Sequence, residues 1–179
     1  MKVNSLAVFC GSKPGKDPIY VEEALILGKL MAQHKINLIY GGGNKGLMGA
    51  VADAVMQGGG NVTGIIPAIL LEWEQQHEGI TDLQIVADMH VRKKMMYELC
   101  DAAIVLPGGN GTLDELFEML TWNTLKIHSK KIILMNCGNY YDHLIEHVKK
   151  MQHEDFLYEE WDERLIVCTT ATEAINFLI

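Results

Sequence analysis

The feature that most constrains the fold of this chain is a short apolar run followed directly by a glycine-rich turn. Residues 102–106 (AAIVL) are apolar throughout, and PGGNGT (107–112) follows them directly. The pattern predicts a buried strand, a turn and a helix opened by Thr112. Such a turn presents backbone N–H groups at a helix N-terminus, where the helix dipole favours an anion such as phosphate. Asp114 and Glu115 add two carboxylates to the first helical turn. A phosphate loop that also carries an acid indicates an enzyme acting on a phosphorylated substrate, although first-turn carboxylates can also simply complement the helix dipole.

The same alternation of apolar runs and helical stretches recurs along the chain. We expect strands at Leu6–Cys10, Asn37–Tyr40, Val62–Ile66, Leu83–Ala87, Ala102–Leu106, Ile132–Asn136 and Leu165–Cys168. Helices are expected near residues 18–34, 46–58, 91–100, 112–126, 141–153 and 171–178. Strands that are apolar on both faces and separated by helices are typical of a parallel sheet covered on both sides. The predicted fold is therefore α/β: a single doubly wound, Rossmann-like domain over residues 1–179, with about seven parallel strands.

Composition excludes several classes of function. The 179 residues carry a net charge of −8, which argues against a broad nucleic-acid surface, because such a surface needs a basic patch. No apolar stretch approaches the roughly 18 residues of a membrane helix, and no signal-peptide pattern opens the chain. The four cysteines are scattered and form no CxxC pair, which predicts buried thiols in a reducing compartment and a cytoplasmic protein.

Three glycine-containing loops are expected on one rim of the sheet, because ligands of such folds bind beyond the carboxyl ends of the strands. They are residues 10–12 (CGS), 41–46 (GGGNKG) and 107–112. The middle loop matches GxGxxG, but the next strand ends in Ile66-Pro67 with no acid for a dinucleotide ribose. Nor does a Lys-Ser or Lys-Thr pair follow it at P-loop spacing. A tight turn that needs glycine is the alternative interpretation of this loop.

Two further patterns carry candidate side chains. Arg92 and Lys93 follow a predicted strand, where they could pair with a phosphate or with Glu115, or form a solvated basic turn. Residues 143–147 (HLIEH) match a zinc-protease pattern, but without a downstream ligand motif they do not predict a metal site. The polar segment 68–81 is the least regular and is a candidate lid.

Four sequence blocks together resemble one family. They are FCGS (9–12), GGG (41–43) with GLMG (46–49), DMH (88–90) with RK (92–93), and PGG (107–109) with GT (111–112) and Glu115. In this order they resemble the cytokinin-activating phosphoribohydrolases, the "lonely guy" (LOG) proteins, and their bacterial relatives. The resemblance covers about residues 5–160. Family members are often labelled lysine decarboxylases, but no lysine stands in a recognisable pyridoxal-phosphate context here.

The resemblance implies hydrolysis of the N-glycosidic bond of a nucleoside 5′-monophosphate, releasing free base and ribose 5-phosphate without a metal or organic cofactor. Position by position, Arg92 and Glu115 match the pair held essential for catalysis. Further implied substrate contacts, spread over the rim loops and the two helices, are Ser12, Gly43, Glu74, Lys93, Gly108, Gly109, Asn110, Gly111, Thr112 and Thr121. A homodimer is also implied. Asn110, where plant members often carry an aromatic residue, leaves the base preference open.

Two alternative functions fit the same residues. One is a general nucleosidase acting on ordinary purine or pyrimidine nucleotides. The other is a non-catalytic carrier on the same fold, similar to the molybdenum-cofactor carriers, that binds a phosphorylated pterin or nucleotide. The presence of both Arg92 and Glu115 favours hydrolysis over a role as a carrier protein.

Overall fold

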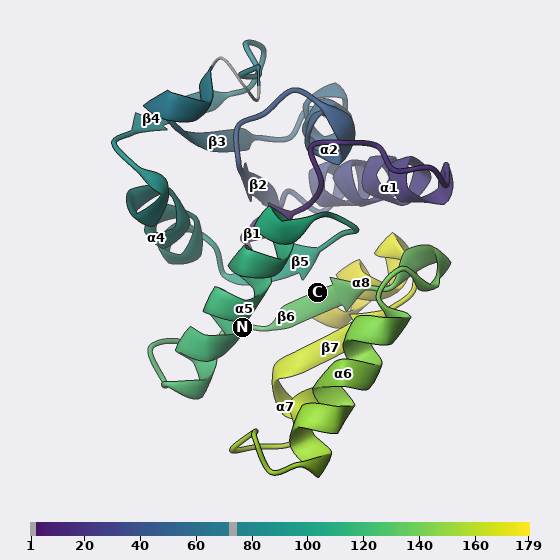
Figure 1. Ribbon diagram of the computed structural model, residues 1–179. Helices are drawn as coiled ribbons and strands as arrows, with labels where there is room; N and C mark the ends of the chain where they lie inside the picture. Colours follow the sequence, from purple (N-terminus) through teal and green to yellow (C-terminus); the bar gives the residue numbers. More distant parts are fainter. Residues whose placement is uncertain (1–2, 72–74) are drawn as a thin grey trace.

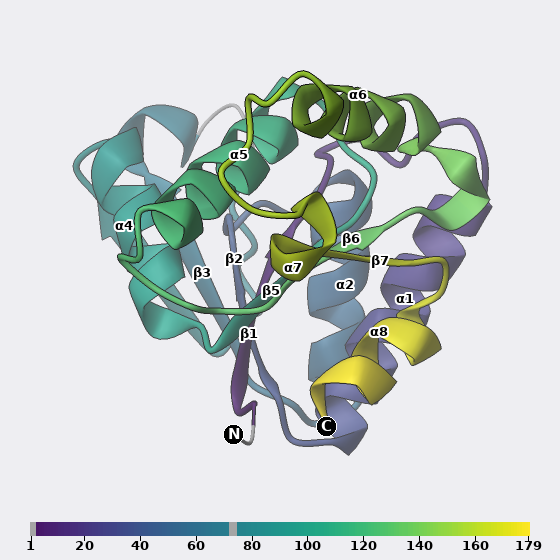
Figure 2. The same ribbon diagram turned by 90° about the horizontal axis from the view of Figure 1, so that it is seen from below.

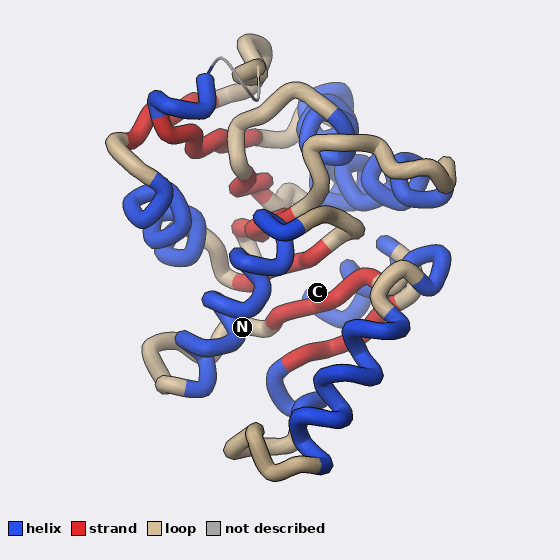
Figure 3. The backbone as a smooth tube through the Cα atoms, viewed as in Figure 1, coloured by secondary structure: helices blue, strands red, loops and turns tan. Residues whose placement is uncertain are grey.

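The computed structural model describes residues 3–71 and 75–179 and contains one seven-stranded parallel sheet (Figures 1 and 3). The strand order is β4-β3-β2-β1-β5-β6-β7. The strands are β1 (Ser5–Phe9), β2 (Asn37–Tyr40), β3 (Val62–Pro67), β4 (Asp82–Val86), β5 (Ala102–Val105), β6 (Ile132–Met135) and β7 (Leu165–Cys168). The helices are α1 (Ile19–Gln33), α2 (Gly46–Gln57), α4 (Met89–Leu99), α5 (Asn110–Thr124), α6 (Asp142–His153), α7 (Trp161–Arg164) and α8 (Ala171–Leu178). Two 3₁₀ turns, η1 (Ala68–Leu70) and η2 (Cys137–Asn139), complete the described elements.

Helices cover both faces of the sheet, as the apolar strands predict. Along β1, Leu6 and Val8 face one buried cluster while Ala7 and Phe9 face the other. The first cluster lies under α1, α2 and α8, and the second under α4, α5 and α6 (Figure 2). The two-sided burial confirms the predicted doubly wound α/β architecture.

The strand order places a switch point at the centre of the sheet. From β1 the chain runs outward through β2, β3 and β4, and the second half runs the other way from β5. β1 and β5 pair in parallel, with Leu6 opposite Ala102 and Phe9 opposite Val105. The loops that leave their carboxyl ends lead to helices on opposite faces of the sheet, α1 on one and α5 on the other. Ligand sites of such folds lie beyond the strand ends at this point.

Two helices begin earlier than the sequence predicts. Helix α4 starts at Met89 and not at 91, because the Asp88 carboxylate accepts a hydrogen bond from the Val91 N–H at 2.9 Å and caps the helix. Helix α5 starts at Asn110 and not at 112, with Gly109 as its N-cap. Gly111 and Thr112 therefore lie inside the first turn of α5, and their backbone N–H groups belong to that turn of the helix and not to the preceding loop.

The buried face of α5 is also shifted from the expected stripe of Leu113, Leu116, Phe117 and Leu120. Its buried residues are Thr112, Leu116, Met119 and Asn123. Phe117 is only half-buried, because it lines a groove between α5 and α6 instead of packing on the sheet. Among the described residues, no helix combines the length and the apolar character needed to cross a membrane.

Close packing of α1 on α2 gives a stability prediction. A Cβ at Gly28 of α1 would lie 2.6 Å from the Ala54 Cβ and 2.7 Å from the Val51 carbonyl oxygen. Gly28→Ala therefore lowers the free energy of unfolding by about 1–3 kcal/mol, although alanine gains about 1 kcal/mol of helix propensity. Urea denaturation measures the change, with the exposed Lys29→Ala on the same helix as control. A Gly28→Ala protein as stable as the parent would contradict this account of the packing.

Candidate active site

A cavity of about 310 Å³ opens at the switch point between β1 and β5. Its walls come from the loops after β1 and β2, from α4, and from the first two turns of α5. This volume lies at the lower end of the range for small-molecule sites. Seven of the twelve predicted catalytic and substrate-binding residues line this one cavity: Ser12, Arg92, Gly109, Asn110, Gly111, Thr112 and Glu115.

The amino end of α5 forms the floor of the cavity. Gly109 and Gly111 face open space, since a Cβ at either position would have no heavy atom within 4 Å. The protein interior therefore does not require glycine at these two positions, but an approaching ligand would. N–H groups of a helix's first turn have no intrahelical acceptors, and they attract anions together with the helix dipole. The floor has the chemistry of a phosphate cradle.

The loops after β1 and β5 are in direct backbone contact beside this floor. The Gly11 N–H donates to the Pro107 carbonyl oxygen at 3.0 Å. A Cβ at Gly108 would lie 2.1 Å from the Thr112 Oγ1 and 2.9 Å from the Gly11 nitrogen. Gly108 therefore serves the contact between the loops, and it lines a neighbouring cavity instead of the one that holds Arg92.

Arg92 enters the cavity from the first turn of α4 and is almost completely buried, with 5% of its surface exposed. Its Nη2 donates to the Gly41 carbonyl oxygen at 3.1 Å. A Cβ at Gly41 would lie 2.1 Å from this Nη2, so glycine leaves the room that the guanidinium occupies. The loop after β2 thus fixes where the positive charge sits, and Glu115 lines the same cavity from α5.

Lys93 does not line the cavity. Its Nζ lies 3.1 Å from carboxylate oxygens of both Asp114 and Glu118 on α5. Burial alone would lower the pKa of Lys93, but the hydrogen bonds that its ammonium donates to Glu118 and Asp114 outweigh burial and raise the pKa. Lys93 therefore stays charged and partly offsets the negative charge of Asp114 in the first two turns of α5.

Glu118 has a second partner below this ion pair. The Tyr97 hydroxyl donates to Glu118 Oε2 at 2.8 Å and lies 3.4 Å from the Glu115 backbone carbonyl oxygen. Burial, then the hydrogen bond to Glu118, raises the pKa of Tyr97 well above its usual range. Tyr97 therefore remains a hydrogen-bond donor that ties α4 to the turn of α5 carrying Glu115.

Two other expected site residues, Gly43 and Thr121, lie outside the cavity. Gly43 is buried and forms a β-bridge with Gln76, while Thr121 hydroxyl donates to the Phe117 carbonyl oxygen at 2.7 Å. Thr121 lines the groove between α5 and α6, away from the cavity. Glu74 lies outside the described residues.

The segment after residue 74 is fixed to the glycine loop, in the region where the sequence suggests a lid. The Asn44 N–H donates to the Gln75 carbonyl oxygen, and the His77 N–H donates to the Gly42 carbonyl oxygen, both at 2.9 Å. The His77 imidazole lies between Asp53 (Nε2 to Oδ1, 3.0 Å) and the Gly79 N–H, which donates to Nδ1 at 3.1 Å. Backbone hydrogen bonds therefore tie Gln75 and His77 to the loop after β2.

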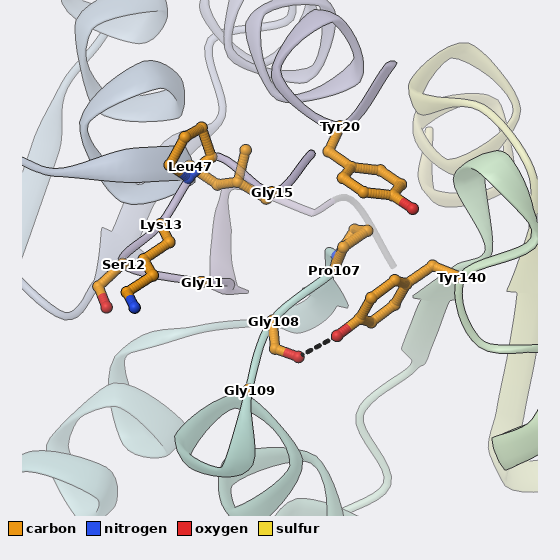
Figure 4. A pocket seen from close by; sticks show the side chains of 11 residues that line it. Gly11, Ser12, Lys13, Gly15, Tyr20, Leu47, Pro107, Gly108, Gly109 and Tyr140 are labelled. Atoms are coloured by element: carbon orange, nitrogen blue, oxygen red, sulfur yellow. Dashed lines mark hydrogen bonds between the residues drawn. The ribbon is translucent and has the colours of Figure 1, made fainter. Parts of the chain in front are cut away.

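A second cavity, of about 370 Å³, adjoins the first across the loop contact (Figure 4). The two share Gly11, Ser12 and Gly109. Tyr20 and Tyr140 form its aromatic side, opposite Ser12 and Lys13 (Figure 4). We call it the outer cavity, and the one holding Arg92 and Glu115 the reaction cavity.

Metal ligation has no support in the described part of the chain, where no group of three or more His, Cys, Asp or Glu side chains could hold an ion. All four cysteines are buried. Burial raises the pKa of Cys137 and of Cys168 to about 11, so both stay protonated thiols at neutral pH.

Sequence reasoning missed how Gly41 and Tyr140 support the site. Gly41 belongs to the glycine-rich loop noted in the sequence, but the contact of its carbonyl oxygen with Arg92 is visible only in the structure. Tyr140 acts through one hydroxyl and falls in no motif. For Tyr140, the one available signal is its position in the loop that follows β6.

Comparison with known proteins identifies the family. A family model described as "possible lysine decarboxylase" matches residues 48–178. Cytokinin riboside 5′-monophosphate phosphoribohydrolase of Rhodococcoides fascians is 42% identical over 96% of this chain and 87% of its own length. The enzyme of that name called LOG7 in Arabidopsis thaliana is 47% identical over 97% of this chain and 80% of its own length. The chain belongs to this LOG family.

Solved structures show the same fold. The molybdenum cofactor binding protein of Rippkaea orientalis matches with a TM-score of 0.74 at 20% identity, covering 99% of this chain and 96% of that one. A molybdenum cofactor carrier protein of Chlamydomonas reinhardtii matches with a TM-score of 0.73 at 18% identity, with the same coverage. At this level of sequence identity, the similarity to these two structures shows only a shared fold.

Placement of Arg92 by Gly41 gives a prediction specific to the LOG-family site. Gly41→Ala keeps an ordinary backbone conformation, but the new Cβ displaces the end of the Arg92 side chain. We expect the protein to stay folded, with its melting temperature little changed, and turnover of a nucleoside monophosphate to fall by about a hundredfold, as small misplacements in active sites do. Gly79→Ala, which has only ordinary contacts, is the matched control. Undiminished turnover in Gly41→Ala would show that activity does not depend on the placement of the Arg92 guanidinium by Gly41.

Proposed function

We propose that the protein hydrolyses the N-glycosidic bond of a nucleoside 5′-monophosphate. The C1′–N bond breaks, the oxygen of a water molecule bonds to C1′, and the proton that water loses balances the one gained by the leaving base. The products are the free base and ribose 5-phosphate. The observation that carries the proposal is that α4 and α5 bring Arg92 and Glu115 into one cavity with an open, glycine-lined helix N-terminus.

The 5′-phosphate docks on the first turn of α5 in this proposal. The backbone N–H groups around Gly109 and Gly111 supply donors, and Ser12 offers a hydroxyl from the loop after β1. Neutralisation of Asp114 by Lys93 lowers the repulsion that the phosphate meets there. Binding the phosphate positions the ribose, so binding energy away from the scissile bond orients the reacting carbon.

Glu115 stabilises the transition state. Cleavage of an N-glycoside builds positive charge on the ribose, and a nearby carboxylate stabilises that charge or orients the attacking water. Arg92, which is buried and held by Gly41, keeps a fixed positive charge in the same cavity. Its guanidinium can orient the carboxylate or grip the oxygens of the substrate, because its planar fork suits either partner.

The description of the family model as a possible lysine decarboxylase finds less support in the site. Lysine decarboxylation through pyridoxal phosphate needs a lysine amine at the cofactor. Among the described residues that line the reaction cavity, the cation is Arg92 and none is a lysine. The resemblance of the fold to molybdenum-cofactor carriers leaves carriage as the second candidate, but a binding protein has no need of the Arg92 and Glu115 pair.

We further propose a cytoplasmic homodimer built from one domain. The groove between α5 and α6 supports the dimer, because Leu125, Phe156 and Tyr158 on its margins are 64%, 77% and 93% exposed. Exposed apolar clusters of this kind mark protein–protein contacts. The four buried cysteines, which form no disulfide in the described part of the chain, support a reducing compartment. The acidic net charge of −8 disfavours nucleic acid as a partner.

The catalytic assignment is tested with two variants. Glu115→Gln removes the charge but keeps the shape, and Arg92→Ala removes the guanidinium. We expect each variant to lose at least about a hundredfold in kcat, which is typical for removal of one preorganised electrostatic contact. Release of base from AMP and from isopentenyladenosine monophosphate, measured by chromatography, gives both the rates and the base preference.

Glu98→Gln is the matched control, because Glu98 lies exposed on α4 and pairs only with Lys94 among the described residues. Arg92→Lys tests whether charge alone suffices, and we expect it to stay impaired because lysine lacks the fork. Circular dichroism confirms folding of each variant. Parental rates in well-folded Glu115→Gln or Arg92→Ala would refute the mechanism.

A further inference from the structure

Three consecutive carbonyl oxygens after β5 each accept a hydrogen bond from another loop. The Leu106 carbonyl accepts from the Tyr141 hydroxyl at 2.8 Å, and the Pro107 carbonyl accepts from the Gly11 N–H at 3.0 Å. The Gly108 carbonyl accepts from the Tyr140 hydroxyl at 2.6 Å (Figure 4). Two of the three donors are adjacent tyrosines in the loop between β6 and α6, on which no catalytic motif falls.

The third of these bonds controls the direction of an N–H group. A trans peptide is a rigid plane in which the C=O of one residue and the N–H of the next point in opposite directions. Fixing the Gly108 carbonyl toward Tyr140 therefore turns the Gly109 N–H away from Tyr140. The bond at Leu106 has no such consequence, because the following residue is Pro107, which has no N–H. The Tyr140 hydroxyl thus fixes the direction of a backbone N–H group, whereas the Tyr141 hydroxyl does not.

Glycine makes this control necessary. A Gly–Gly peptide has few steric barriers to rotation, because neither residue carries a Cβ. If the Gly108–Gly109 peptide turned over, it would present a carbonyl oxygen where its N–H now lies. An oxygen beside a phosphate is repulsive, whereas an N–H donor is attractive, so the orientation decides whether this peptide helps or opposes binding.

The Tyr140 ring is itself held in place. It packs edge-on against Tyr20, with ring centroids 5.5 Å apart, and against Tyr141, at 4.7 Å. Tyr141 is buried, and its N–H donates to the Asn136 Oδ1 at 2.7 Å. The tyrosine loop is therefore anchored to the end of β6, and the Tyr140 hydroxyl reaches the glycine loop from a fixed support.

We propose that Tyr140 is a positioning residue for phosphate recognition: its hydroxyl holds the Gly108–Gly109 peptide with the N–H available to the 5′-phosphate. The inference rests on the phosphate cradle of the proposed function. It assigns to Tyr140 an effect on affinity for the phosphate group and none on the bond-breaking step.

The test compares Tyr140→Phe with Tyr20→Phe. Tyr140→Phe keeps the ring packing and removes the hydroxyl. Tyr20 faces the same outer cavity, and its hydroxyl makes no hydrogen bond to the described residues, so Tyr20→Phe is the matched control. Titration calorimetry with ribose 5-phosphate measures phosphate affinity directly, and steady-state kinetics with AMP give KM and kcat separately.

We expect Tyr140→Phe to raise the Kd for ribose 5-phosphate and the KM for AMP by the same factor. That factor is about three- to tenfold, the worth of one ordinary hydrogen bond. The kcat stays within about twofold of the parent, and Tyr20→Phe behaves as the parent. A purely structural role would instead lower thermal stability and kcat together.

Unchanged affinity for ribose 5-phosphate in Tyr140→Phe, or an equal loss in Tyr20→Phe, would overturn the inference. Failure of the proposed function has a different signature, because the parent protein would then bind ribose 5-phosphate without releasing base from AMP. In that case the calorimetric comparison still decides the role of Tyr140. A parent protein that binds no ribose 5-phosphate would contradict both.

Discussion

The loops that leave β1 and β5 run in backbone contact, and the reaction cavity depends on that contact. Only glycine allows it, since a side chain at Gly108 would collide with Thr112 and with the backbone of Gly11. The bond from the Gly11 N–H to the Pro107 carbonyl closes the contact. Because β1 and β5 meet at the switch point of the sheet, this junction lies where the crevice of a doubly wound fold opens. It sets the angle at which α5 presents its first turn.

Charge is distributed around this first turn in a way that suits a phosphate beside an acid. Lys93, held between Asp114 and Glu118, offsets charge on the α4-facing side of α5. Arg92 supplies the opposite sign inside the cavity, where burial strengthens electrostatic effects. Glu115 lines the cavity with it. In the proposed function, the helix dipole and the neighbouring cations would together allow a carboxylate and a phosphate to lie close to one another.

Much of this arrangement follows from the sequence, and the exceptions have physical causes. Most strands were predictable because they are short apolar runs, and β2 and β7 have the predicted bounds. The starts of α4 and α5 were not, because capping by Asp88 and a glycine N-cap at Gly109 extend both helices beyond their apolar patterns. Short α7 lacks enough residues to show a helical period.

The candidate site was predictable where residues act through motifs, and less so where they act through packing. Arg92 and Glu115 stand out in the sequence and meet in one cavity. Spacing along the chain does not reveal which face of α5 adjoins α4, so the ion pairs of Lys93 and the distant position of Thr121 emerge only in three dimensions. Tyr140 contributes one hydroxyl from a loop beyond β6, and no local sequence pattern predicts this contact.

The most direct test of the central claim compares AMP with adenosine. The parent protein is incubated with each, and adenine and ribose 5-phosphate are quantified over time. If the first turn of α5 binds the phosphate and Glu115 assists cleavage, AMP yields both products in equal amounts, and adenosine has a kcat/KM lower by at least about a hundredfold. Equal kcat/KM for the two substrates, or binding of AMP with no adenine released, would contradict the account.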